Sequence, residues 1–109
     1  MKYNVLTVPI FEKQLKWLVK KFPSLKTEFS DLVNELEENP IKGTALGNNC
    51  YKIRMGVSSK SRGKSGGARV ITHIYIENET VFLLAIYDKS EQTDITNKEL
   101  KELLSQIER

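Results

Sequence analysis

The residues of this sequence best suited to chemistry are basic side chains gathered in one stretch of the chain. Lys52 and Arg54 stand one residue apart, and Arg69 opens a later segment rich in β-branched residues. Residues 39–76 include seven lysines and arginines but no aspartate or glutamate. The rest of the chain carries an excess of acidic residues, so the formal charge of +3 conceals one concentrated cationic surface. Segregated charge of this kind predicts a polyanionic partner.

Such a cationic surface is compatible with RNA cleavage, because RNA supplies both a phosphodiester and its own nucleophile, the 2′-hydroxyl. Cleavage requires in-line positioning of that hydroxyl, stabilisation of extra charge on the phosphorane, and protonation of the 5′-oxygen. Arginine and lysine stabilise the charge without a metal ion. A lysine among other cations has a lowered pKa and can act as a base or an acid. The composition permits metal-free RNA cleavage, although phosphate binding alone requires the same residue types.

Three other side chains are considered, and two of them have two interpretations each. His73, the only histidine, shares the side of Arg69 by strand alternation and is either an acid–base group or a satisfied residue of the sheet. Tyr87 is either a base-stacking residue or part of the core. Cys50, the only cysteine, is interpreted as inert because no histidine is expected near it to activate the thiol. With one cysteine and one histidine, the usual clustered metal sites are not expected.

The segment 58–67 is rich in glycine, serine and lysine and separates two predicted strands. Its Gly63-Lys64-Ser65 resembles the end of a phosphate-binding loop, but the pattern requires glycine where Ser58 stands, and a strand rather than a helix follows. The remaining interpretations are a solvated flexible linker and a cationic loop that makes a concave surface with its flanking strands.

The elements expected to position these residues begin with a strand over residues 2–8. Pro9 suits the first turn of a helix, whose apolar stripe recurs every three or four residues as far as Lys21. Trp17 lies off this stripe and is either at the core edge or in a protein contact. Ser24 is the predicted N-cap of a second helix, which ends at Asn39. Two consecutive amphipathic helices indicate a helical hairpin.

The second half of the chain is predicted to supply most of a sheet. Residues 40–49 are interpreted as a loop, 51–55 as a strand with one apolar and one cationic face, and 68–77 as another strand. Residues 80–87 are nearly all apolar, as in a strand covered on both faces. Thr96 and Glu99 form a capping box that begins a last helix. The order β-α-α-β-β-β-α predicts one α+β domain over residues 1–109 with an antiparallel-rich sheet.

Three segments carry a resemblance to a known family. They are Cys50-Tyr-Lys-Ile-Arg54, Gly67-Ala-Arg69-Val-Ile and Leu84-Ala-Ile-Tyr-Asp-Lys-Ser-Glu91. Together they resemble the RelE/ParE superfamily of toxins from bacterial type II toxin–antitoxin systems, and the basic insertion is most similar to HigB-like members. The resemblance implies a RelE-like fold and a ribosome-dependent mRNA endonuclease that inhibits translation without a metal or other cofactor.

The same resemblance implies roles for particular residues. Lys52, Arg54 and Arg69 fall on basic positions that such toxins use, and Lys89 matches a basic position after the last strand. The basic side chains implied to bind phosphates of mRNA or rRNA are Lys60, Arg62 and Lys64. RelE has a catalytic tyrosine shortly beyond the last basic position, whereas this chain has Ile95 at about that place and no tyrosine after it. The proton acceptor is therefore a lysine, His73, or the ribosome and substrate themselves.

The resemblance also implies partners: the ribosome with its mRNA, and an antitoxin with a helix-turn-helix domain. No apolar run approaches the ~20 residues that a membrane span requires, and no signal peptide is recognised, so we expect a cytoplasmic protein and no membrane partner. Two alternatives remain. One is a ParE-like inhibitor that binds DNA gyrase without catalysis, and the other is an inactive RNA-binding relative. The clustered cations favour an RNA-cleaving toxin.

Overall fold

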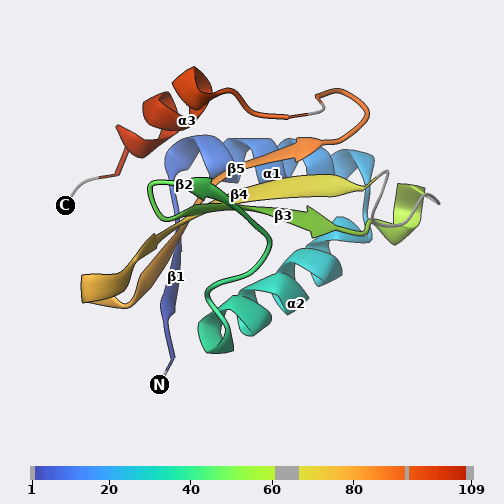
Figure 1. Ribbon diagram of the computed structural model, residues 1–109. Helices are drawn as coiled ribbons and strands as arrows, with labels where there is room; N and C mark the ends of the chain where they lie inside the picture. Colours follow the sequence, from blue (N-terminus) through green and yellow to red (C-terminus); the bar gives the residue numbers. More distant parts are fainter. Residues whose placement is uncertain (1, 61–66, 93, 108–109) are drawn as a thin grey trace.

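The computed structural model describes residues 2–60, 67–92 and 94–107, which form three α-helices and a five-stranded sheet (Figure 1). In chain order the elements are β1 (Asn4–Thr7), α1 (Pro9–Lys21), α2 (Leu25–Glu38), β2 (Thr44–Gly47), β3 (Cys50–Met55), β4 (Ala68–Tyr75), β5 (Thr80–Asp88) and α3 (Asn97–Leu104). Short 3₁₀ turns span Ser58–Lys60 and Ile76–Asn78. The predicted α+β class, helical hairpin and C-terminal helix are confirmed.

Strand β2 corrects the prediction of a loop over residues 40–49. Its Thr44 and Ala45 pair with Lys52 and Tyr51 of β3 in an antiparallel hairpin. The two residues between the strands, Asn48 and Asn49, both have positive φ angles, of 55° and 59°. Asparagine tolerates this left-handed conformation, and a two-residue turn of this hand matches the twist of paired strands. The sequence Asn48-Asn49 therefore indicated a β-hairpin at this place in the chain.

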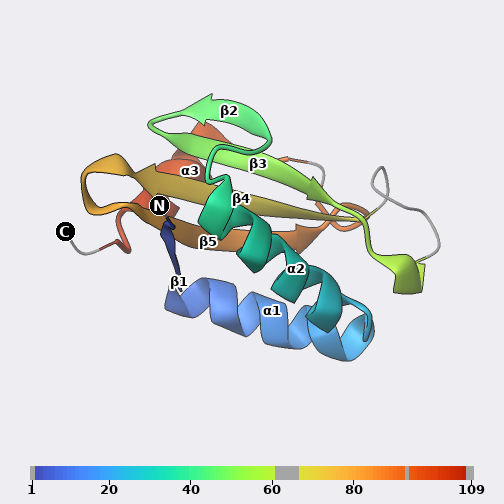
Figure 2. The same cartoon turned by 90° about the horizontal axis from the view of Figure 1, so that it is seen from below.

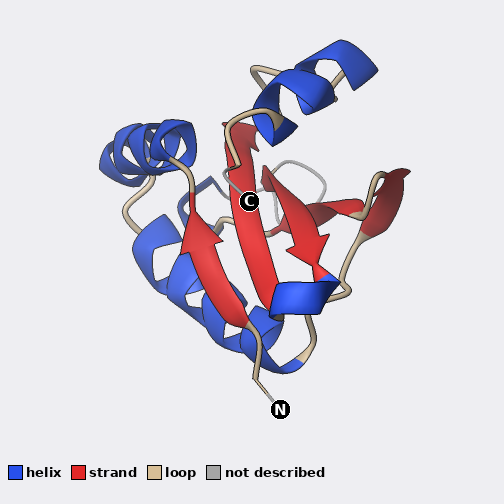
Figure 3. Cartoon of the chain, turned by 90° about the vertical axis from the view of Figure 1, so that its left-hand side faces the viewer, coloured by secondary structure: helices blue, strands red, loops and turns tan. Residues whose placement is uncertain are grey.

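The sheet has the order β1-β5-β4-β3-β2, with β1 parallel to β5 and every other pair antiparallel (Figure 3). The antiparallel-rich sheet predicted from the sequence is therefore confirmed. Strand β1 pairs with β5 only as far as Leu83. Beyond that point the Ile86 N–H donates to Oε1 of Gln14 at 3.0 Å, so a side chain of α1 occupies the place of a neighbouring strand.

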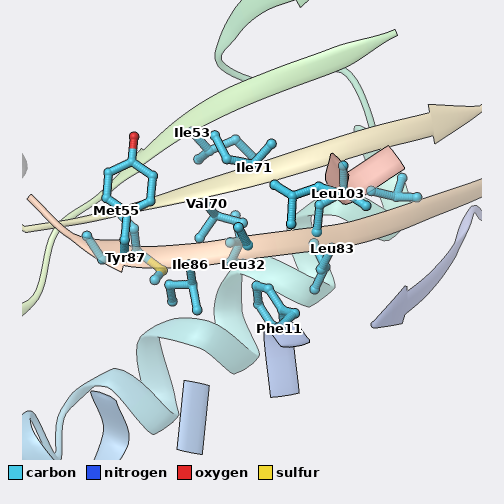
Figure 4. Close-up of a cluster of buried hydrophobic side chains, with 14 of the residues drawn as sticks. Phe11, Leu32, Ile53, Met55, Val70, Ile71, Leu83, Ile86, Tyr87 and Leu103 are labelled. Atoms are coloured by element: carbon cyan, nitrogen blue, oxygen red, sulfur yellow. The ribbon is translucent and has the colours of Figure 1, made fainter. Parts of the chain in front are cut away.

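Helices cover both faces of the sheet: α2 crosses one face with α1 beside it, and α3 lies against the other (Figures 1 and 2). The core contains fully buried side chains from helices and strands, including Phe11, Leu25, Ile53, Val70 and Ile86 (Figure 4). On the opposite face, α3 contributes its buried Leu100 and Leu103. The prediction that residues 80–87 are covered on both faces is confirmed, because β5 is buried along nearly its whole length.

Ser24 is the N-cap residue of α2, as predicted, but its side chain does not cap the helix. Ser24 has helical angles (φ −64°, ψ −20°) and makes no capping hydrogen bond to the helix backbone. Its hydroxyl instead donates to Glu28 and accepts from the Ser59 N–H, both at 3.0 Å. Glu28 also accepts from the backbone and hydroxyl of Ser58, each at 2.8 Å. These contacts engage the side chain that would have capped the helix, and they tie α2 to the segment after β3.

The predicted capping box of α3 is confirmed. The Thr96 hydroxyl accepts from the Glu99 N–H at 3.1 Å, and the Glu99 carboxylate accepts from the Thr96 N–H at 2.9 Å. A short sequence pattern was sufficient to predict this capping box because Thr96 and Glu99 lie within one helical turn of each other. The capping box fixes where α3 begins, and α3 is the element that covers the cationic face of the sheet.

Candidate phosphate-binding site

A row of side chains crosses three adjacent strands at one end of the sheet. Arg54 of β3 is paired with Arg69 of β4, and Arg69 is paired in turn with Tyr87 of β5. Residues paired across strands project from the same face with Cβ atoms about 5 Å apart. Lys52 lies in the next row along the same face, opposite Ile71. Strand alternation thus brings Lys52, Arg54 and Arg69 together, as the sequence predicted. We call these three residues and Tyr87 the cationic row.

The two arginines of the row differ in exposure. Arg54 is exposed, whereas Arg69 is only 3% exposed and donates from Nη1 to the Ala68 carbonyl at 3.1 Å. Like charges directly opposite each other destabilise a sheet, and burial of a charged group adds to that cost. Two guanidinium groups in this arrangement are therefore not expected to stabilise the sheet. It is well suited to binding an anion, since arginine binds phosphate in a bidentate manner.

An acidic residue that sequence analysis missed lies beside this row. The Lys52 ammonium is 3.2 Å from Oδ1 of Asp94, in the segment that precedes α3. The pKa of Asp94 is lowered, chiefly by a hydrogen bond from the Ile95 N–H, then by Lys52 and more weakly by Lys89. The carboxylate thus lies in the field of two lysines from different parts of the sheet. We interpret the Asp94 carboxylate as an anion of the protein itself that occupies a position where a phosphate can bind.

Tyr87 is more buried than its predicted stacking role requires. It is 8% exposed, and its hydroxyl is buried without a hydrogen-bond partner among the described residues. Figure 4 shows its ring directed away from α1 and α2, toward the face that carries the arginines. Burial raises the pKa of Tyr87, and Asp94 and Glu99 raise it further, while Arg69 opposes the change. The phenol therefore keeps its proton near neutral pH.

His73 shares the face of Arg69, as alternation predicted, but lies four residues along β4, about 13 Å away. It is 3% exposed, and its Nδ1 is 3.5 Å from the Cys50 sulfur. The interpretation that no histidine stands near Cys50 was therefore wrong, because strand pairing places the two residues opposite each other. The structure separates His73 from the cationic row and associates it with Cys50.

The remaining predicted site residues belong to the segments that flank the row. Lys89 is half-buried after β5, and its N–H donates to the Gly67 carbonyl at 3.0 Å, which joins the end of β5 to the start of β4. Lys60 ends the 3₁₀ turn Ser58–Lys60, and its side chain lies outside the described part of the structure. Arg62 and Lys64 lie outside the described residues altogether.

Neither a metal-binding cluster nor a membrane-spanning helix is present within the described ranges. Among residues 2–60, 67–92 and 94–107, no three histidine, cysteine, aspartate or glutamate side chains are grouped to hold a metal ion. None of the helices in those ranges is long and apolar enough to cross a membrane.

Comparisons with known proteins identify a matching family and similar folds. Residues 10–107 match the model of a family described as the RelE toxin of the RelE/RelB toxin–antitoxin system. The fold is similar to that of Escherichia coli toxin RelE, solved in the free state as a double arginine-to-alanine mutant. That match has a TM-score of 0.62 and 19% identity, and covers 97% of this chain and 94% of that one. A toxin–antitoxin complex, RelBE2 from Mycobacterium tuberculosis, matches with a TM-score of 0.57 and 18% identity, over 81% of this chain and 99% of that one.

Proposed function

This chain belongs to the RelE toxin family, and from that premise we propose that it is a ribosome-dependent mRNA endonuclease that acts without a metal ion. The observation that carries the proposal is the pairing of Arg54 with Arg69 on one sheet face, with Lys52 in the next row. A gyrase-binding surface has no need for guanidinium groups held directly opposite each other. A phosphodiester whose charge increases during reaction does need them.

In the proposed reaction, the 2′-oxygen of the RNA forms a bond to phosphorus and the bond to the 5′-oxygen breaks. Arg54 and Arg69 bind the non-bridging oxygens and stabilise the charge that develops on them. The 2′-hydroxyl loses its proton to a base, and the departing 5′-oxygen gains one from an acid. Arginine is unsuited to either transfer because its pKa is too high. The proton transfers therefore require other residues.

Lys52 and Lys89 are the candidates to move protons, because Lys52 belongs to the cationic row and both lysines act on the Asp94 carboxylate beside it. Tyr87, which remains protonated near neutral pH, is suited to donate a proton rather than accept one. His73 is the least favoured acid–base group because it is buried about 13 Å along β4 from Arg69. The phosphates on either side of the cleaved bond are assigned to Lys60, Arg62 and Lys64.

The proposed partners follow from the family. One relative in the comparison was solved as a toxin–antitoxin complex, and we propose a cognate antitoxin with a helix-turn-helix domain for this chain. The ribosome and its mRNA are the proposed targets, which places the protein in the cytoplasm. The basic insertion between β3 and β4 supports a closer relation to HigB-like members.

The decisive experiment is expression of the chain in a bacterium, followed by mapping of mRNA 5′ ends. We expect new ends within translated codons, and we expect them to disappear with Arg69→Ala and with Lys52→Ala combined with Arg54→Ala. Lys26→Ala, which changes an exposed lysine of α2, is the matched control and should remain toxic. An SOS response with intact mRNA would contradict the proposal and support a ParE-like gyrase inhibitor. Folded protein with neither effect would indicate an inactive relative.

A further inference from the structure

Helix α1 carries a second cationic surface. Lys13, Lys16, Trp17 and Lys20 recur at spacings of three and four, so they share one side of the helix. All four are exposed, while Phe11 belongs to the buried side. In Figure 2, α1 forms an outer edge of the molecule. We call these four residues the α1 ridge.

The lysines of the α1 ridge are not held in ion pairs among the described residues, although Glu12 lines a surface hollow together with Lys13 and Lys16. Within the described part of the chain, Lys13, Lys16 and Lys20 form no ion pair. Lys21 differs, because its ammonium is 2.9 Å from Glu91 and 3.9 Å from Asp88. The acidic groups at this end of the helix are thus engaged by Lys21, which leaves the ridge with net positive charge.

Trp17 gives the ridge an aromatic surface. Its side chain is 54% exposed, an unusual state for a residue that normally buries a large apolar area. The Lys21 ammonium lies 5.2 Å from the centre of its ring, which orients the indole at the surface. Exposed aromatic rings beside cations are what single-stranded RNA-binding surfaces use: the cations contact phosphates and the ring stacks on a base.

A cavity of about 460 Å³ lies beside the ridge and extends to Tyr87 of the cationic row. It is lined by α1 side chains, including Lys13 and Trp17, together with Tyr87 of β5 and Glu91 of the following loop. Tyr87 is also paired with Arg69, so the cavity and the row share a residue. An RNA strand bound at the arginines can therefore continue across this cavity to α1.

We propose that the α1 ridge is a second RNA-binding surface, on which Lys13, Lys16 and Lys20 contact phosphates and an unpaired base stacks on Trp17 beside the cavity. The inference rests on the proposed function, since it concerns the same RNA. The ridge differs from the row in its task, because lysines on a helix surface contact the RNA backbone without recognising its sequence. The ridge holds the RNA, and the row holds the phosphate to be cleaved.

Trp17 is the only tryptophan of the chain and is therefore a built-in probe. The test is a fluorescence titration at low salt with a short 2′-O-methyl oligoribonucleotide, which lacks the nucleophile and cannot be cleaved. We expect saturable quenching of Trp17. Lys16→Gln combined with Lys20→Gln should weaken binding several-fold and reduce the slope of log affinity against log salt by about 1.4, at about 0.7 per contact for single strands.

The matched control is Lys98→Gln with Lys101→Gln, which removes two exposed lysines from α3 and should leave affinity and slope unchanged. If RNA binds but Trp17 fluorescence does not change, or the Lys16 and Lys20 variant binds like the parent, the inference is wrong. The proposed function would survive that result if Arg54→Gln still weakened binding. Failure of the parent chain to bind RNA in this assay would contradict the inference, whereas the proposed function is tested separately by the mapping of mRNA 5′ ends.

Discussion

The cationic row and the α1 ridge are both basic, but they are built differently. The row contains two arginines on a rigid sheet, one of them buried, and an acidic residue lies next to it. The ridge consists of exposed lysines on one helix without acidic partners among the described residues. Planar guanidinium groups with restricted side chains fix the position of a phosphate, whereas flexible ammonium groups attract a polyanion without fixing it. We therefore propose that the row positions the phosphate and that the ridge captures the RNA.

The largest expected effect comes from Arg69→Ala. Loss of one preorganised group that stabilises transition-state charge lowers a rate by about 10²–10³-fold, and we expect that loss in mRNA cleavage by a translation extract. Arg69→Lys keeps the charge but not the planar fork, so it should restore only part of the activity. Full activity of Arg69→Ala would remove the row from the catalytic site.

Tyr87→Phe tests whether the row also supplies a proton. Loss of a general acid lowers a rate by about 10²–10⁴-fold, so we expect strongly reduced cleavage. We expect no loss of stability, because a buried hydroxyl without a partner costs about 1–3 kcal/mol. Urea unfolding measures the free energy of unfolding, and cleavage in a translation extract measures activity. A variant that is less stable yet fully active would reverse the assignment.

The α1 ridge should affect RNA capture rather than the chemical step. For Lys16→Gln with Lys20→Gln, we expect a several-fold higher substrate concentration at half-maximal cleavage and an unchanged maximal rate. A change of this kind reports lost binding that is equal in the ground state and the transition state. A lower maximal rate at saturating substrate would show that the ridge and the row are not separate in function.

Asp94→Asn should have a smaller effect in the opposite direction. Removal of the carboxylate frees Lys52, so we expect RNA affinity to rise a few-fold, as measured by anisotropy with the 2′-O-methyl oligonucleotide. The exposed pair contributes no more than about 1 kcal/mol, so stability should hardly change. Asp31→Asn, at an exposed site on α2, is the control. Unchanged or weaker binding by Asp94→Asn would show that the carboxylate does not compete with RNA.

The smallest expected effect is a pH dependence from Tyr87. Its pKa in the folded protein is raised, chiefly by burial, above the ordinary value of about 10. The resulting stability is fully present below that ordinary value and is lost as pH rises through the folded pKa. The parent chain should thus lose more stability in alkaline solution than Tyr87→Phe does. If the free energies of unfolding of the two proteins fell in parallel above about pH 10, this assignment would be contradicted.

Much of this architecture could be predicted because it depends on local spacing. Alternation placed Lys52, Arg54 and Arg69 on one face, and a pattern within one turn predicted the capping box of α3. Strand β2 was missed because it is only four residues long and mostly exposed, without an apolar alternation. The helical spacing of Lys13, Lys16 and Lys20 was also present in the sequence, but it becomes meaningful only when the exposed side of α1 is known.

The contacts that could not be predicted join residues far apart in the chain. Asp94 reaches Lys52 across 42 residues, and Ser24 contacts Ser59 across 35. Cys50 faces His73 only because β3 and β4 pair in one particular register. A shift of one residue would turn these side chains to opposite faces. Sequence patterns indicate which face a residue occupies within its own strand, but not which residue of another strand lies beside it.

Both ends of the basic insertion between β3 and β4 are held by hydrogen bonds to other parts of the fold. One end is held to α2 by the hydrogen bonds of Ser58 and Ser59, and the other is joined to the end of β5 through the carbonyl of Gly67. Replacements or length changes between these attachment points leave the register of Arg54 and Arg69 untouched. The insertion can therefore vary during evolution while the sheet that carries Arg54 and Arg69 is inherited unchanged.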